Sequence, residues 1–115
     1  QLQARRAITI SQLYNLEGGT EMHVRSSTFS GRADKVKEME AHLKIIKPML
    51  AAIPGVISIH TAWNDDGQGT VFAVYENKEK ADAASAAIQG VWSKMAAFLA
   101  APPTLSEFSN VVKLV

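Results

Sequence analysis

Two stretches of this sequence repeat apolar residues at alternating spacings of three and four, and each predicts an amphipathic helix. In the first, from 33 to 53, charged residues occupy the other positions, and the apolar ones are Val36, Met39, Leu43, Ile46, Leu50 and Ile53. In the second, which follows residue 77, the repeat is Ala81, Ala84, Ile88, Val91, Met95 and Phe98. Each helix therefore has an apolar face that must pack against another layer of the fold.

The ends of both predicted helices carry their own signals. Pro54 and Gly55 stop the first helix, and the pair at 102–103, both proline, ends the second. Asn77 can cap the second helix by accepting a hydrogen bond from a free backbone amide. Pro48 lies inside the first pattern, where we expect it to weaken the last turns because proline has no amide donor.

Four short stretches rich in β-branched and aromatic residues predict strands around these helices. They are 23–29, 56–64, 70–76 and 107–115. Between the second and third, the sequence Asp-Asp-Gly at 65–67 has the composition of a hairpin turn. The order strand, helix, strand, strand, helix, strand predicts a ferredoxin-like α+β fold, with a four-stranded antiparallel sheet and both helices on one face.

Both faces of this predicted sheet carry apolar residues. Along 56–64, Ile59 and Trp63 point to one side, while Val56 and Ala62 point to the other. Two helices can cover only one face, and a second copy of the chain is the simplest cover for the other. We therefore expect a homodimer.

Composition and length exclude several classes of protein. Twelve Lys and Arg against eleven Asp and Glu leave a net charge of +1, so no overall field favours nucleic acid. With no cysteine the chain forms no disulfide or thiolate site, which fits a cytoplasmic protein. Its three histidines lack a metal-ligand spacing, and no apolar run approaches the roughly 18 residues of a membrane span. We expect no metal and no membrane segment.

The 115 residues leave room for a single domain. All predicted elements lie within 22–115, and the first methionine is Met22. We therefore expect one domain over 22–115, preceded by an N-terminal extension or cloning remnant at 1–21.

Over Met22 to Val115 the chain resembles the dimeric α+β barrel superfamily and, within it, the antibiotic-biosynthesis-monooxygenase-like domains. The resemblance rests on the element order, on Ile-Pro-Gly-Val at 53–56, on the turn at 65–67 and on Tyr-Glu-Asn-Lys-Glu at 75–79. It implies two sheets paired into a barrel with a cavity in each protomer. It also implies, for some members, oxidation of aromatic substrates without metal or cofactor, so we expect no cofactor here.

Haem-degrading members of this family are poorer matches. They use an Asn on the first strand, a Trp late on the third and a His on the second helix. This chain has His23 and Arg25 on the first strand, Tyr75 near the place of that Trp, and no histidine in 78–99. The quinone-forming members use Trp, Tyr, Asn and Arg around the substrate, and this chain has those residue types without a matching spacing.

His60 is the candidate catalytic residue, because an imidazole in mid-strand exchanges protons around neutral pH. The alternative is a hydrogen-bonded histidine at the sheet or dimer surface. Arg25, which shares a strand face with His23, is a candidate for binding an acidic or phenolate group. The alternative is that both are edge charges that lie in water and discourage unwanted strand pairing.

Trp63 and Tyr75 are candidates to line an aromatic pocket, and the alternative is that they fill the core or the dimer interface. Trp92 is expected in the core, and His42 in solvent.

The leading hypothesis is a small-molecule-binding dimeric domain, with cofactor-independent monooxygenase activity on an aromatic or apolar substrate as its candidate chemistry. The alternative is a non-catalytic dimerisation or regulatory domain. A pocket lined by His60, Tyr75 or Trp63 favours the first, and a cavity filled by Ile59, Phe72 and Met95 favours the second.

Overall fold

A computed structural model describes residues 22–115 of the chain. Its elements are β1 (His23–Ser30), η1 (Ala33–Lys35), α3 (Val36–Ala51), β2 (Val56–Trp63), β3 (Gln68–Tyr75), α4 (Lys78–Met95), η2 (Ala96–Phe98) and β4 (Thr104–Phe108). This order confirms the predicted ferredoxin-like α+β class. The predicted extension at 1–21 lies outside the described residues.

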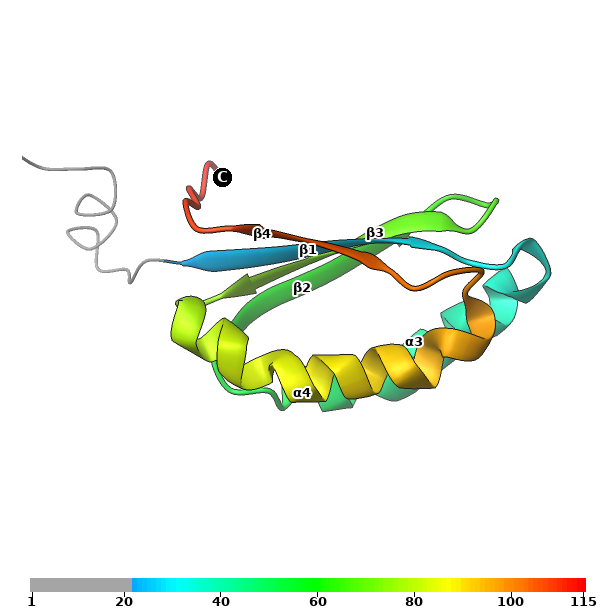
Figure 1. The fold of residues 1–115 in the computed structure, drawn as a ribbon, viewed down its shortest axis with the longest axis horizontal. Helices are drawn as coiled ribbons and strands as arrows, with labels where there is room; N and C mark the ends of the chain where they lie inside the picture. Colours follow the sequence, from blue (N-terminus) through cyan, green and yellow to red (C-terminus); the bar gives the residue numbers. More distant parts are fainter. Residues whose placement is uncertain (1–21) are drawn as a thin grey trace, which may run out of the picture.

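The four strands form one antiparallel sheet in the order β2-β3-β1-β4. Both long helices lie on the same side of it, so the molecule has two layers (Figure 1). β1 is an interior strand, flanked by β3 and β4, and the sheet edges are β2 and β4. Within residues 22–115, no helix is long and apolar enough to cross a membrane.

The buried residues of both helices follow the spacing that the sequence predicts. Met39 and Ile46 of α3 are 1% and 3% exposed. In α4 the buried positions are Ala81, Ala84, Val91 and Met95. The first helix starts as a 3-10 turn, becomes α-helical at Val36 and runs past Pro48 to Ala51, two residues short of the predicted end.

The core has two apolar clusters along the interface between sheet and helices. The larger, towards the end of α4, contains Phe29, Met39, Ile46, Val91, Met95 and Leu99. The smaller, at the start of α4, contains Ala73, Tyr75, Ala81 and Ala84. Ala73 and Tyr75 of β3 therefore face the helices.

Local capping and turn chemistry agree with the prediction. Asn77 accepts a hydrogen bond from the backbone N of Lys80 at 2.8 Å, which satisfies a free amide in the first turn of α4. In the β2–β3 turn, Asp66 accepts from the backbone N of Gln68 at 3.0 Å. Gly67 has a φ of 91°, a conformation that favours glycine.

The closing strand differs from the prediction of 107–115. β4 spans Thr104–Phe108 and pairs with β1 from Thr28↔Thr104 to Val24↔Phe108. β1 starts at His23, so residues beyond Phe108 find no partner strand in this sheet. The apolar run at 111–115 resembles a strand in composition, but it has no regular structure.

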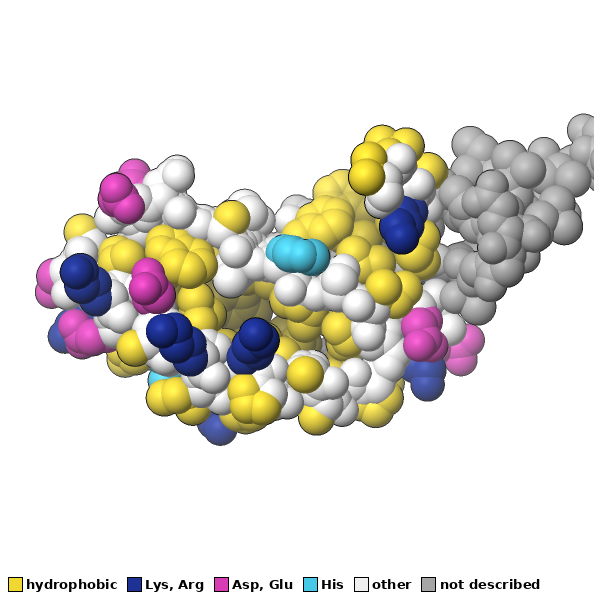
Figure 2. Space-filling model, turned by 180° about the vertical axis from the view of Figure 1, so that it is seen from behind, with side chains coloured by type: hydrophobic (Ala, Val, Ile, Leu, Met, Phe, Trp, Pro, Cys, Tyr) yellow, Lys and Arg dark blue, Asp and Glu magenta, His cyan; other side chains and the backbone are white. Residues whose placement is uncertain are grey.

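The sheet face away from the helices is covered by neither helix, and we call it the open sheet face. Because strand residues alternate, Val24, Phe72 and Phe108 lie on it, opposite to Ala73 and Tyr75. Phe72 is 46% exposed and Phe108 51%. Figure 2 shows hydrophobic side chains in the upper part of the molecule, where the sheet lies, and also along its lower edge.

Candidate functional site

A charged cluster lies between β1, β4 and the first turns of α4, with Arg25 at its centre. The Arg25 side chain is only 15% exposed. Its Nε donates to Oε1 of Glu107 at 2.9 Å, and its Nη2 donates to Oδ1 of Asp82 at 2.6 Å. Its Nη1 donates to the carbonyl oxygen of Ala81 at 2.6 Å and to Oγ of Ser85 at 2.9 Å. One guanidinium therefore ties two strands to a helix.

Strand register explains how this cluster forms. Arg25 and Glu107 are direct partners in the β1–β4 pairing, so their side chains lie on the same face of the sheet. Ala81, Asp82 and Ser85 lie within the first eight residues of α4, and Ser85 follows Ala81 by four positions and Asp82 by three, so they share one side of the helix. The register and the helical repeat bring the carboxylates to the guanidinium.

His23 joins the cluster through the same carboxylate. Its Nε2 lies 2.9 Å from Oε1 of Glu107, and its side chain is 5% exposed, against 44% for Glu107. A carboxylate that holds one nitrogen of an imidazole orients the ring, which is the arrangement found around histidines that act as bases. The pair is therefore the best candidate for proton transfer in the described part of the chain.

The charges in the cluster stabilise one another. Hydrogen bonds from His23 and Arg25 lower the pKa of Glu107. Hydrogen bonds from Lys78 and Arg25 lower the pKa of Asp82. Burial opposes the charge on Arg25, but its bonds to Glu107 and Asp82 outweigh that penalty and raise its pKa. Glu107, Asp82 and Arg25 are therefore ionised at neutral pH.

Tyr75 lies next to this cluster on the helix face. It pairs with His23 in the β1–β3 ladder and is 2% exposed. Burial raises the pKa of Tyr75, and the nearby positive charge of Arg25 offsets part of that effect. The phenol is therefore protonated at neutral pH, and it can donate but does not serve as a base.

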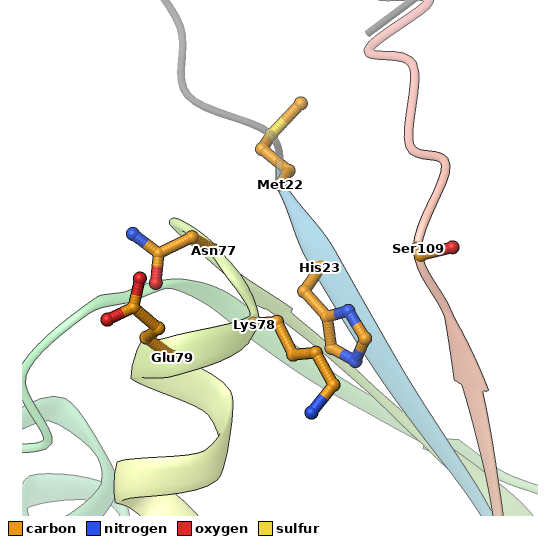
Figure 3. Close-up of a pocket in the computed structure, with 6 residues that line it drawn as sticks. All are labelled: Met22, His23, Asn77, Lys78, Glu79 and Ser109. Carbon is orange, nitrogen blue, oxygen red and sulfur yellow. The ribbon is translucent and has the colours of Figure 1, made fainter.

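A half-open depression of about 260 Å³ adjoins the cluster at the start of α4. Its lining residues are Met22, His23, Asn77, Lys78, Glu79 and Ser109. In Figure 3, the side chains of His23 and Lys78 lie side by side, while those of Asn77 and Glu79 point away from them. Of these lining residues, His23 is the buried one, at 4% exposed.

A second depression, of about 420 Å³, lies at the other end of α4. It is mainly apolar, and its lining residues are Trp92, Ser93, Ala96, Leu99, Ala100, Ala101, Pro102 and Pro103. Neither depression is lined by His60, Trp63 or Tyr75. Among residues 22–115, no group of three or more His, Cys, Asp and Glu side chains could hold a metal ion.

The sheet divides the four predicted site residues. Arg25 and Tyr75 lie together on the helix face, on the neighbouring strands β1 and β3. Trp63 lies on the same face but pairs with Gly69, six residues along β3 from Tyr75, which is about 20 Å. Its ring packs against the larger core cluster, so the two aromatics do not meet.

His60 lies on the opposite side of the sheet from this pair. It pairs with Phe72, is exposed, and points away from the helices. The candidate base His60 and the candidate binding residues Arg25 and Tyr75 therefore do not meet within a single chain, because the sheet stands between them. His60 is a residue of the open sheet face.

Two further predictions need correction. His23 and Arg25 are not edge charges in water, because β1 is an interior strand and both side chains are nearly buried. His42 is only partly in solvent, because its ring packs 5.5 Å from that of Phe98, and its buried Nε2 has no hydrogen-bond partner. Trp92 agrees with its prediction and packs on the core beside Phe29, at 6.1 Å.

Sequence reasoning overlooked Glu107, Asp82 and Ser85 as members of the cluster. A signal was available for the first two, because the ferredoxin-like order places the first strand between the third and the fourth. A buried arginine there requires carboxylate partners from the last strand or the second helix.

Comparisons with known proteins identify the fold. No family model matches this sequence, and no curated protein is recognisably similar to it. Among solved structures, Rv0793 from Mycobacterium tuberculosis is similar, with 16% identity and a TM-score of 0.65 over 82% of this chain and 99% of that one. A protein proposed to be an antibiotic biosynthesis monooxygenase, from Nitrosomonas europaea, is 17% identical, with a TM-score of 0.67 over 79% and 91%.

A variant of SnoaB, a cofactor-independent oxygenase from Streptomyces nogalater, is 14% identical, with a TM-score of 0.66 over 83% of this chain and 98% of that one. These likenesses show that the chain shares the ferredoxin-like α+β fold of these proteins, which include one proposed to be an antibiotic biosynthesis monooxygenase and one cofactor-independent oxygenase.

Proposed function

We propose that this chain is a homodimeric domain that binds a small aromatic or apolar molecule and oxygenates it without a cofactor. The observation that supports this most is the pair of nearly buried basic side chains, His23 and Arg25, which share one oxygen of Glu107 between the sheet and α4. The same fold occurs in a cofactor-independent oxygenase. A cytoplasmic location, compatible with the lack of cysteine, is part of the proposal.

The proposed reaction needs a base and a positive charge. A hydroxylated aromatic substrate loses a phenolic proton to the base, and the electron-rich anion then reacts with oxygen. A ring CH₂ becomes a carbonyl, and the second oxygen atom leaves with both hydrogens as water, so the substrate supplies all electrons. His23 is the candidate base, oriented by Glu107, and Arg25 supplies the positive field for the anion.

His60 has a different place in this proposal. It lies on the open sheet face, which the second copy would cover, so it is proposed to contact the partner. If the substrate instead binds between the two sheets of the dimer, His60 is the nearest histidine and the base. The two sites are distinguishable because each predicts a different variant that loses turnover.

Oxygen uptake measured with a panel of hydroxylated aromatic compounds tests the proposal. His23→Ala is expected to lower turnover by about 100- to 10,000-fold, the usual effect of losing a positioned base. His60→Ala, the matched histidine variant on the other face, is expected to keep turnover within a few-fold. Loss in His60→Ala alone would move the site to the space between the sheets. No uptake by the wild-type protein with any compound would reject the oxygenase function.

Two observations favour the rival function, a non-catalytic dimerisation or regulatory domain. Arg25 already bonds to Glu107, Asp82, Ala81 and Ser85, so its donors are largely satisfied inside the fold. Ile59 and Met95 also pack in the two core clusters, as this reading requires, although Phe72 stays exposed. Calorimetric titration with the same panel separates the two, since the rival predicts dimerisation without ligand binding.

A further inference from the structure

A series of four hydrogen bonds links the start of α4 to His23 through the charged cluster. Oδ2 of Asp82 accepts from Nζ of Lys78 at 2.9 Å, and Oδ1 of Asp82 accepts from Nη2 of Arg25 at 2.6 Å. Nε of Arg25 donates to Oε1 of Glu107 at 2.9 Å, and the same oxygen lies 2.9 Å from Nε2 of His23. The two ends of the series, Lys78 and His23, line one depression (Figure 3).

The carboxylate next to His23 fixes which ring nitrogen carries the proton. Hydrogen bonds from His23 and Arg25 lower the pKa of Glu107, so at neutral pH its oxygens are charged and only accept. Nε2 of His23 must therefore be the donor in its contact with Oε1. In the neutral ring the lone pair is then on Nδ1, which is the atom that takes up a proton.

The position of that carboxylate depends in turn on how firmly Arg25 is held. Glu107 belongs to β4, an edge strand whose residues are all exposed, and its own side chain is 44% exposed. The two terminal nitrogens of Arg25 bond to α4, at the Asp82 carboxylate, the Ala81 carbonyl and the Ser85 hydroxyl. Because the guanidinium is planar, holding both terminal nitrogens also fixes the direction in which Nε donates.

We propose that Asp82 and Ser85 are positioning residues for His23, which hold Arg25 so that Glu107 keeps the imidazole in its Nε2–H form. Both act through two intervening side chains. This role rests on the proposed function, in which His23 is the base. It assigns Nδ1 as the atom that accepts the proton, so a substrate has to present its hydroxyl group to Nδ1.

Other titratable groups around His23 do not replace this carboxylate. Tyr75, its partner on β3, has a raised pKa and stays neutral. Lys78 and Glu79 of α4 line the depression with His23, but an ammonium group cannot accept a hydrogen bond, and in Figure 3 the Glu79 carboxylate points away from the ring. Among these groups, Glu107 is the one bonded to Nε2.

The ring proton of His23 measures this positioning without any substrate. In isotope-labelled protein at mildly alkaline pH, nuclear magnetic resonance distinguishes the Nε2–H form from the Nδ1–H form and times the exchange of the ring N–H with water. We expect the Nε2–H form in the wild type, with slow exchange because the side chain is 5% exposed. Exchange should be about tenfold faster in D82A and about threefold faster in S85A, which keeps the bond to the Ala81 carbonyl.

Glu79→Ala is the matched control. It removes a carboxylate from the first turn of α4 that lines the same depression but does not belong to the series of hydrogen bonds. Exchange in this variant is expected to stay within about twofold of the wild type. Thermal unfolding checks that each variant is folded. S85A keeps the test decisive if D82A unfolds, because alanine favours the helix.

Two results would overturn the positioning role. One is exchange in D82A and S85A that matches the Glu79→Ala control, and the other is an Nδ1–H ring in the wild type. Both are measured on the chain alone. A wild type that takes up no oxygen therefore rejects the oxygenase function, while the ring proton still decides whether Asp82 and Ser85 position His23.

Discussion

Arg25 and Glu107 face each other across the β1–β4 pair, with Nε of Arg25 2.9 Å from Oε1 of Glu107. β4 is an edge strand of five exposed residues, so apolar burial does little to hold it. This side-chain contact supplements the backbone hydrogen bonds and joins β4 to the interior of the sheet. The cluster thus has a structural effect whether or not it also serves chemistry.

Replacing Arg25 tests that effect. Arg25→Met keeps the aliphatic stem but leaves Glu107 and Asp82 without their shared cation, and we expect a loss of about 1 to 3 kcal/mol in unfolding free energy. Urea unfolding at pH 7 measures it. Lys35→Met is the matched control, because its bond to Glu38 is exposed and is expected to contribute less than about 0.5 kcal/mol. Equal losses in both variants would contradict a special role for Arg25.

Acid stability should depend on the same carboxylates. The pKa values of Glu107 and Asp82 are lowered in the folded protein, so their stabilising contribution is present above the unfolded value near 4 and is lost as pH falls through the folded value. Unfolding free energy should therefore fall between about pH 5 and pH 2, and less steeply in Glu107→Gln. The two proteins are compared by urea unfolding across this range, and identical slopes would show that Glu107 is not involved.

We expect replacement by alanine to have opposite effects on stability at two of the glycines. Gly67 has a φ of 91°, and an added Cβ would lie 2.5 Å from the backbone oxygen of Gly31, so Gly67→Ala is expected to destabilise the turn by more than about 1 kcal/mol. Gly90 lies in α4 with nothing within 4 Å of an added Cβ, so Gly90→Ala should stabilise the helix by about 0.5 to 1 kcal/mol. Thermal unfolding of both variants is the test, and a stabilised Gly67→Ala would contradict the turn geometry.

The His42 side chain buries a polar atom that lacks a hydrogen bond. Its Nε2 is buried without a hydrogen-bond partner and its ring packs on Phe98, so His42→Leu is expected to stabilise the fold by about 1 kcal/mol. Thermal unfolding at pH 7 measures the change. A clear loss of stability would show that the imidazole has a bonded role, such as with an ordered water.

The sequence predicted the two long helices well because their burial is periodic and local. Met39, Ile46, Val91 and Met95 fall on the buried faces that the spacing of three and four defines. The charged cluster could not be predicted as easily, because its partners are far apart in the chain. Arg25 meets Asp82 across 57 positions and Glu107 across 82, and only the order of the strands in the sheet brings them together.

The closing strand was mispredicted, and the face of the sheet on which His60 lies could not be predicted, for related reasons. Composition favoured a strand over 107–115, whereas the C-terminal end of β4 is decided by where its antiparallel partner β1 begins. Alternation along β2 separates His60 from Trp63, but it does not say which side the helices cover. Both outcomes depend on tertiary pairing, which local patterns do not encode.

Light scattering of the wild-type chain and of Phe72→Lys is the most direct test of the central claim, that a second copy covers the open sheet face. Phe72 is 46% exposed on that face, so a charge there should disrupt the interface without entering the core. We expect twice the 12.4 kDa chain mass for the wild type at micromolar concentration, and a folded monomer for Phe72→Lys. A monomeric wild type, or a dimer that Phe72→Lys leaves intact, would contradict the account.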